Sequence, residues 1–217
     1  MTFTDLLQKA TKALQDRGIP FAVGGILVAS VYRKEKRAMN NLALLVNAAP
    51  KDISFLTDIF PGELSETLLP DSAVIHGVKA VRSLATVKNV LVINVDSKVN
   101  LGLEIVFSTF PWFKEAFERA QYNRIDFGFG SIPSLTVEDV IIAKLYSSTV
   151  AEDRYLDRDD VQNILQAKHE LDLAYLTKQI NKFSLEFPKS LWEDASEGLR
   201  RIGRSTGAKK GKLLLEG

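Results

Sequence analysis

The chain has 217 residues, with 28 Lys or Arg against 27 Asp or Glu, so its formal net charge is only +1. This balance argues against a protein that binds nucleic acid over its whole surface, although it leaves room for a local basic patch. The absence of cysteine excludes disulfides, cysteine-ligated metals and thiol catalysis. Two histidines, His76 and His169, are too few for a multi-histidine metal site, and we assign them no role. No apolar run approaches the roughly 18 residues of a membrane span, so we expect a cytoplasmic protein without a membrane partner.

The first part of the chain has the pattern of an α/β domain. Apolar residues at helical spacing predict a helix that ends at Gly18, and a short strand follows over 21–23. The strand breaks at Gly24-Gly25, and an apolar helix is expected over 26–32. A basic loop then leads to a strand over 41–46.

The middle of the chain carries weaker patterns, and its topology between 52 and 89 stays open. We expect a helix over 52–60, a loop over 62–71 and a short strand over 72–76. Alternating apolar residues predict strands over 90–95 and 101–107. A helix that begins near Pro111 and a short alternating segment over 124–129 complete this part.

From Thr136 onward the pattern is helical. Runs at helical spacing begin at Thr136 and cover 157–167, 173–183 and 189–202, and a basic, glycine-broken tail follows. We therefore predict an α/β fold of the mixed, α+β kind in three parts. These are an α/β domain over 1–135, a helical domain over 136–205 and a flexible tail over 206–217.

The glycine pair Gly24-Gly25 is the first candidate site. Two glycines between a strand and a helix leave bare backbone amides at a helix N-terminus, where a phosphate binds well. The alternative is a tight turn whose glycines only relieve steric crowding. Arg37, in the basic run with Arg33, Lys34 and Lys36, could steer an anionic ligand toward this turn, or it could be a solvated loop residue.

The order of these features resembles the minimal nucleotidyltransferases of the polymerase-β-like superfamily, in particular the abortive-infection toxin type, which implies a bacterial-type protein. The resemblance covers roughly residues 1–165. It rests on the glycine turn, Arg37, the strand to Val46, the strand around Glu104, the segment 134–145 and the pattern Arg154-x-x-Asp157-x-x-Asp160. It implies a nucleotidyltransferase-like mixed sheet with flanking helices and a C-terminal helical domain. It also implies phosphate binding by Gly24, Gly25 and Arg37, and a site for Mg²⁺ and a nucleoside triphosphate.

The sequence departs from this family where the family carries Asp-x-Asp. There the two acids hold the Mg²⁺ ions of two-metal phosphoryl transfer. Here the same positions fall on Asn41 and Ala43, which we interpret as degenerate metal positions. Because Mg²⁺ prefers anionic oxygen ligands, we expect no metal at this place. A different register, using Asp52 or Asp96, lacks the required spacing.

Four charged residues remain as candidates. The resemblance gives Glu104, inside an apolar strand, the place of the third acid, and makes Lys144 the second candidate catalytic residue. Lys144 lies in an apolar helix stripe, so it needs a phosphate or acidic partner or a structural ion pair. Asp157 and Asp160, one helical turn apart, are either cleft acids or acids that stabilise a helix start.

We predict a nucleotidyltransferase-fold pseudoenzyme that binds a nucleotide or a protein partner in a regulatory, toxin–antitoxin-like role. The alternative is an active Mg²⁺-dependent transferase that moves a nucleoside monophosphate onto a protein or RNA acceptor. Mg²⁺ and a nucleoside triphosphate would be cofactors under the second hypothesis, and the sequence leaves open whether the chain is an enzyme.

Overall fold

The computed structural model describes residues 1–60, 63–67, 74–78, 90–96, 98, 100–150, 154–187, 189–191 and 195–201, with backbone only for 63–67, 74–78 and 150. The chain forms two compact units. The first comprises Met1–Val28 and Arg37–Thr136, and the second comprises Ala29–Lys36 and Val137–Gly217. A short segment from the first part of the sequence therefore belongs to the helical unit. The predicted tail over 206–217 lies outside the described residues.

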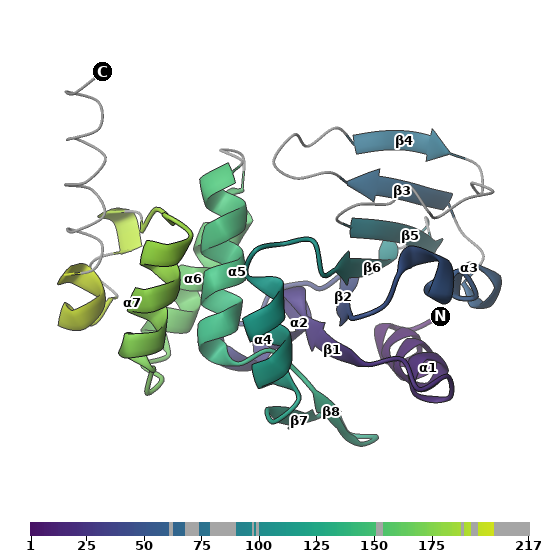
Figure 1. Cartoon of the computed structure of the whole chain (residues 1–217), viewed down its shortest axis with the longest axis horizontal. Helices are drawn as coiled ribbons and strands as arrows, with labels where there is room; N and C mark the ends of the chain where they lie inside the picture. Colours follow the sequence, from purple (N-terminus) through teal and green to yellow (C-terminus); the bar gives the residue numbers. More distant parts are fainter. Residues whose placement is uncertain are drawn as a thin grey trace. The chain divides into compact units, whose positions relative to one another are not determined.

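A mixed sheet forms the centre of the first unit (Figure 1). Its strand order is β1-β2-β6-β5-β3-β4, in which β2 and β6 are parallel and the other neighbours are antiparallel. The strands are β1 (Phe21–Gly24), β2 (Asn41–Val46), β3 (Glu63–Thr67), β4 (Val74–Val78), β5 (Val90–Asp96) and β6 (Leu101–Phe107). The predicted class, a mixed sheet with flanking helices, is confirmed, as are the four strands expected over 21–23, 41–46, 90–95 and 101–107.

Both faces of the two parallel strands are largely buried, and Asn41 and Glu104, which lie on one of them, are partly exposed. The apolar face of the two parallel strands consists of Leu42, Leu44 and Val46 on β2 and Leu103, Ile105 and Phe107 on β6, each at most 2% exposed. Because side chains alternate along a strand, the residues between these lie on the other face. Burial of these apolar side chains stabilises the sheet, and the other face combines the buried Ala43, Leu45 and Val106 with the partly exposed Asn41 and Glu104.

The remaining elements of the first unit are helical segments and one hairpin. They are α1 (Phe3–Gln15), α2 (Gly25–Tyr32), whose last residues belong to the second unit, the 3₁₀ helix η1 (Pro50–Ile53), α3 (Leu56–Ile59), α4 (Phe113–Ala120), β7 (Arg124–Asp126) and β8 (Ser131–Pro133). Helix α1 begins at a capping box, in which Thr2 and Asp5 exchange hydrogen bonds of 2.9 and 3.1 Å. The predicted helices at the start of the chain and after Pro111 are confirmed.

Two predictions for the middle of the chain are wrong. The single helix expected over 52–60 is instead the two short segments η1 and α3. The loop expected over 62–71 contains strand β3, which pairs with β4 on one side and β5 on the other. Residues 63–67 read Glu-Leu-Ser-Glu-Thr, which lacks the apolar alternation of a typical strand. The hydrogen bonds of two neighbouring strands, and not local propensity, form this strand.

The second unit contains the helices that follow residue 136. They are α5 (Val137–Val150), α6 (Tyr155–Gln166), α7 (Leu173–Lys182) and the 3₁₀ helix η3 (Lys189–Leu191). The expected helical runs near 136, 157 and 173 are confirmed. The continuous helix expected over 189–202 is wrong, because residues 195 and 196 are not helical and separate η3 from a final turn at 197–201.

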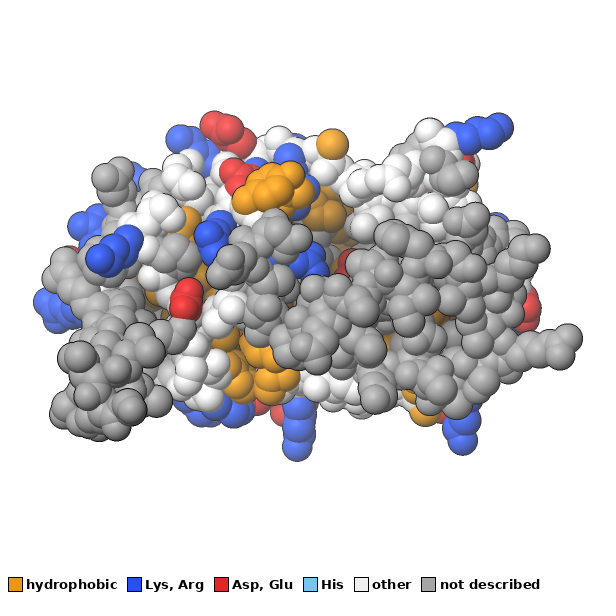
Figure 2. Space-filling view, turned by 90° about the horizontal axis from the view of Figure 1, so that it is seen from above, with side chains coloured by type: hydrophobic (Ala, Val, Ile, Leu, Met, Phe, Trp, Pro, Cys, Tyr) orange, Lys and Arg blue, Asp and Glu red, His pale blue; other side chains and the backbone are white. Residues whose placement is uncertain are grey.

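None of the helices in the described ranges combines the length and the apolar character that a membrane span requires. On the face drawn in Figure 2, the Lys and Arg side chains are dispersed among acidic, polar and apolar side chains. Among the described side chains on that face, they do not form one basic stripe.

Candidate functional site

The glycine bend, which consists of Gly24 and Gly25, lies directly against strand β2. Gly24 is the last residue of β1 and pairs with Ala43. Gly25 begins α2 with a φ of +60°, and a Cβ placed on it would lie 2.6 Å from the Cβ of Ala43. The backbone at Gly25 therefore passes directly over Ala43. Both the positive φ of Gly25 and its contact with Ala43 require glycine at this position.

The parallel register of β2 and β6 extends this site across the sheet. Asn41 pairs with Gly102, and Ala43 pairs with Glu104. Since paired residues on neighbouring strands share a face, all of them lie on the face that carries the glycine bend. A Cβ on Gly102 would lie only 2.5 Å from Oδ1 of Asn41, so the Asn41 amide extends over the Gly102 backbone. The fold thus brings together the glycine bend, Asn41, Ala43 and Glu104.

These residues do not fit the magnesium site that the resemblance implies. They offer one amide oxygen from Asn41, a methyl group from Ala43 and one carboxylate from Glu104. Two neighbouring divalent ions need several anionic oxygens to offset their mutual repulsion. Among the residues that the structure describes, no group of three or more His, Asp or Glu side chains could hold a metal ion.

A substitution at the glycine bend tests its geometry. We expect Gly25→Ala to lower the free energy of unfolding by more than Gly18→Ala, because the two glycines have nearly the same φ, +60° and +62°, but only Gly25 has a neighbour within 4 Å. The backbone conformation alone costs about 1–2 kcal/mol for alanine, and the contact with Ala43 adds an overpacking cost of roughly 1–3 kcal/mol. Urea unfolding of both variants measures the difference, and equal losses would contradict the close approach.

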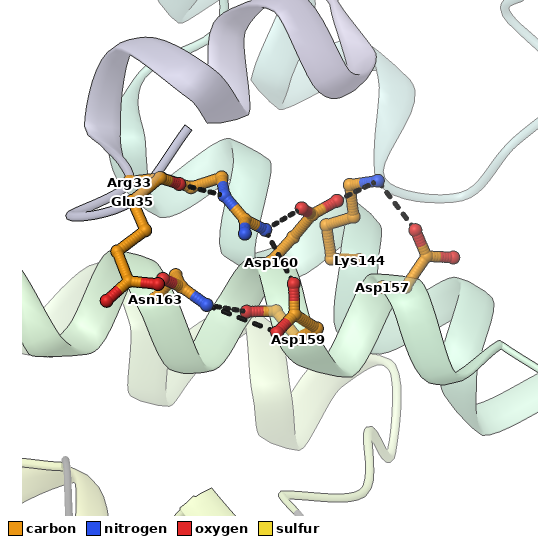
Figure 3. A network of polar contacts seen from close by, with 7 residues as sticks. All are labelled: Arg33, Glu35, Lys144, Asp157, Asp159, Asp160 and Asn163. Carbon is orange, nitrogen blue, oxygen red and sulfur yellow. Dashed lines mark hydrogen bonds and ion pairs between the residues drawn. The ribbon is translucent and has the colours of Figure 1, made fainter. Parts of the chain in front are cut away.

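The other predicted residues belong to the second unit, where they form a cluster of ion pairs (Figure 3). Nζ of Lys144 lies 2.6 Å from Oδ1 of Asp157 and 2.9 Å from Oδ2 of Asp160. The other oxygen of Asp160 accepts a hydrogen bond from Nη1 of Arg33, which also donates to Oδ2 of Asp159 at 2.9 Å. We call these five residues the ion-pair cluster. Asp160, which is completely buried, links its two cations.

The environment of Lys144 keeps this side chain charged. Burial lowers the pKa of Lys144, but the carboxylates of Asp157 and Asp160 together raise it by more, so the pKa lies above its ordinary value of 10.5. Lys144 is therefore an ammonium ion at neutral pH, with two acids of its own unit as observed partners. Both interpretations of the sequence allow acidic partners such as Asp157 and Asp160, so a catalytic role of Lys144 stays a prediction.

The sequence analysis did not predict two members of the cluster: it did not name Asp159, and it placed Arg33 only in the basic run. The side chain of Arg33 is only 3% exposed, and its Nε donates to the carbonyl oxygen of Glu35 at 2.8 Å. The next residue, Lys34, donates its backbone N–H to the carbonyl oxygen of Asn163 on α6. These contacts hold the segment 29–36 within the second unit. In the sequence, the position of Arg33 directly after an apolar helix was the signal that could have indicated its burial.

The basic run of the sequence is consequently divided between the two units. Arg33, Lys34 and Lys36 belong to the second unit, whereas Arg37 belongs to the first. Arg33 is already occupied by the carboxylates of Asp159 and Asp160. Of the four basic residues, only Arg37 lies in the unit that contains the glycine bend.

Two acids in the first turn of α5 also have structural partners that the sequence did not indicate. Glu138 accepts a hydrogen bond of 3.0 Å from the backbone N–H of Asp172, and Asp139 accepts one of 2.7 Å from the hydroxyl of Tyr175. Both acids are buried, and both hold the start of α7 against α5. His169 has a comparable role, with Nε2 2.5 Å from the carbonyl oxygen of Tyr32. The side chain of His76 lies outside the described residues.

Comparison with known proteins finds similarity in fold to solved structures of nucleotidyltransferase-like proteins. No protein-family profile and no curated protein sequence matches the chain. The antibiotic-resistance factor ANT(2'')-Ia is 11% identical, with a TM-score of 0.49 over 98% of this chain and 95% of that one. JHP933 from Helicobacter pylori is 14% identical, with a TM-score of 0.44 over the same shares, 98% and 95%. An antigenic nucleotidyltransferase-like protein from Paracoccidioides brasiliensis is 11% identical, with a TM-score of 0.43 over 74% of each chain. Similarity at this level concerns the fold alone, and nothing about ligands or activity follows from it.

Proposed function

We propose that this chain is a catalytically degenerate nucleotidyltransferase-fold protein that binds a nucleotide in a regulatory role. The proposal rests on the position of Ala43. This residue, whose side chain is only a methyl group, lies between Gly24 on one neighbouring strand and Glu104 on the other. This position is in contact with the glycine bend, but its side chain cannot ligate a metal ion.

The backbone of the glycine bend supports the nucleotide-binding part of the proposal. The first N–H groups of a helix have no partner within the helix, and they carry the positive end of the helix dipole. Helix α2 begins at Gly25 and has no acidic side chain in its first turn. A phosphate group at this helix start would therefore meet backbone donors and no adjacent carboxylate from α2.

The chemistry of β2 supports the loss of transfer activity. Metal-dependent transfer needs ions that bridge the attacking oxygen and the phosphate and offset the charge that develops there. Asn41 and Ala43 supply one neutral oxygen and no anionic one, and Glu104 is a single carboxylate. A ligand held in this way would be bound without being consumed, which suits a regulatory protein whose occupancy is read by a partner chain.

Binding and transfer can be measured separately on the purified chain. We expect a nucleotide to shift the amide resonances of Gly24, Gly25 and Ala43 in a ¹⁵N-labelled sample. We also expect no label to be incorporated from α-³²P nucleotides into protein or RNA acceptors, with either Mg²⁺ or Mn²⁺ present.

The outcomes separate three hypotheses. Binding at these amides without incorporation agrees with the proposal. Robust incorporation that an Ala43→Asn variant retains would favour the active transferase. If no nucleotide shifts these resonances, and a protein co-purifies with the chain, the chain is an interaction module and the proposed function is wrong.

A further inference from the structure

The segment Ala29–Lys36, which we call the strap, belongs to the second unit although the residues on either side of it belong to the first. It comprises the second half of α2 and the residues that follow this helix. Only Ala29 and Arg33 of the strap are buried, and Val31 is 49% exposed. The strap therefore has one fully buried apolar side chain, the methyl group of Ala29, so apolar burial holds it only weakly.

Polar contacts attach the strap to the rest of the second unit (Figure 3). Arg33 makes both of its ion pairs with carboxylates of α6. The backbone N–H of Lys34 donates to the carbonyl oxygen of Asn163 at 3.2 Å, and the carbonyl oxygen of Tyr32 lies 2.5 Å from Nε2 of His169. Because the guanidinium of Arg33 is only 3% exposed, its ion pairs mainly offset the cost of removing this charge from water.

Buried polar atoms on both sides of this attachment favour its opening. Two of the buried side-chain atoms that lack a hydrogen-bond partner among the described residues are Oγ of Ser30, in the strap, and Oδ1 of Asn163, on α6. A buried polar atom without a partner raises the free energy of the folded state, and water bonds to it once it is exposed. Both atoms therefore favour a state in which the strap has left α6.

Helix α6 has a core of its own that does not depend on the strap. Its residues Val161, Ile164 and Leu165 are at most 5% exposed, and the helix packs against α5. Since the strap supplies only one buried methyl group, most of this apolar packing remains when the strap leaves. Few buried apolar contacts on one side and a packed core on the other are the conditions for local opening without global unfolding.

We propose that the strap undocks from α6 as one piece while α5, α6 and α7 stay folded, which gives the second unit a docked and an open state. In the open state, the guanidinium of Arg33 and the carboxylates of Asp159 and Asp160 become accessible to a charged partner, which would shift the equilibrium by binding them. The strap also contains the end of α2, the helix that begins at the glycine bend. This regulatory device goes beyond the proposed function and needs no nucleotide.

Native-state hydrogen exchange of the whole chain tests the open state. The amides of Arg33 and Lys34 report on the strap, and those of Ile164 and Leu165 report on the core of α6. We expect the two strap amides to have equal protection factors, about 100-fold below those of the α6 amides. Their exchange should change little in dilute urea, because undocking exposes little surface.

A pair of serine substitutions tests the physical cause. Ser30→Ala removes a buried hydroxyl that has no partner, so it should stabilise the docked state and raise the protection of Arg33 and Lys34 about tenfold. Ser148→Ala is the matched control, because Ser148 is a buried helix residue of the same unit whose hydroxyl donates to the carbonyl oxygen of Leu145 at 3.1 Å. Both substitutions raise helix propensity alike, but the control should leave the strap unchanged.

Three outcomes would overturn the inference. Strap amides that are as protected as those of α6, with the same urea dependence, would mean that the strap opens only on global unfolding. Unequal protection of Arg33 and Lys34 would mean fraying residue by residue, and an equal response to the two serine variants would remove the proposed cause. The first two results come from the wild-type chain, so they do not depend on how well the variants fold, and none of the three bears on nucleotide binding.

Discussion

Replacement of Asp160 by asparagine is expected to destabilise the second unit by about 3–5 kcal/mol, the usual cost of removing one partner from a buried ion pair. The carboxylate of Asp160 is completely buried and contacts both Arg33 and Lys144, whose side chains are 3% and 13% exposed. Without it, the guanidinium loses one of its two acids and the ammonium keeps only Asp157. Urea unfolding followed by circular dichroism measures the loss.

Asp159 provides a matched control for this substitution. It lies on the same helix and pairs with the same Nη1 of Arg33, but its side chain is 47% exposed. We expect Asp159→Asn to cost about 1 kcal/mol or less, because water screens an exposed pair. If the two variants lose equal stability, Asp160 does not hold the cluster together.

The dependence of the unfolding free energy on alkaline pH gives a second check on the ion-pair cluster. Lys144 has a pKa above its ordinary value of 10.5 in the folded chain, so its ion pairs contribute fully below that pH and are lost as the pH rises through the folded pKa. The difference in unfolding free energy between wild type and Asp160→Asn should therefore be constant near neutral pH and should narrow only above pH 10.5.

Introduction of acids at positions 41 and 43 of β2 is expected to create a divalent-cation site. In the variant with Asn41→Asp and Ala43→Asp, two carboxylates lie on one face of β2, and Glu104 is the direct neighbour of position 43. Without metal, the three negative charges repel one another and lower the melting temperature. With Mn²⁺ or Mg²⁺ at about 100 times its dissociation constant, binding raises stability by about 2.7 kcal/mol. Thermal unfolding with and without the ion measures both effects.

The control for this double variant keeps the side-chain volume at position 43 but leaves out the negative charge there. Asn41→Asp with Ala43→Asn places a side chain of the same size beside the glycine bend but leaves position 43 neutral. We expect this variant to lose stability through crowding at Ala43, which is 5% exposed in the wild type, and to gain none from Mn²⁺. A metal response in the wild-type chain itself would contradict the degenerate interpretation.

The sequence by itself determined the helices, strands and turns that depend on the pattern of a few neighbouring residues. The first helix, the strands over 41–46 and 101–107, and the glycine bend were all predicted, because apolar periodicity and glycine act over a few residues. The lack of a carboxylate at positions 41 and 43 is likewise a property of the sequence. Strand β3 was missed because its residues lack that periodicity and form a strand only through their neighbours.

Only the tertiary structure decided which of these residues meet. The parallel register of β2 and β6 brings Ala43 beside Glu104 across 61 positions of sequence, and the antiparallel register with β1 brings it against the glycine bend. The division of the basic run, with Arg33 in the ion-pair cluster and Arg37 in the other unit, was equally invisible in the sequence. Hydrogen-bond register and the cost of burying a charge act between segments that are far apart in the chain, so one-dimensional patterns do not encode them.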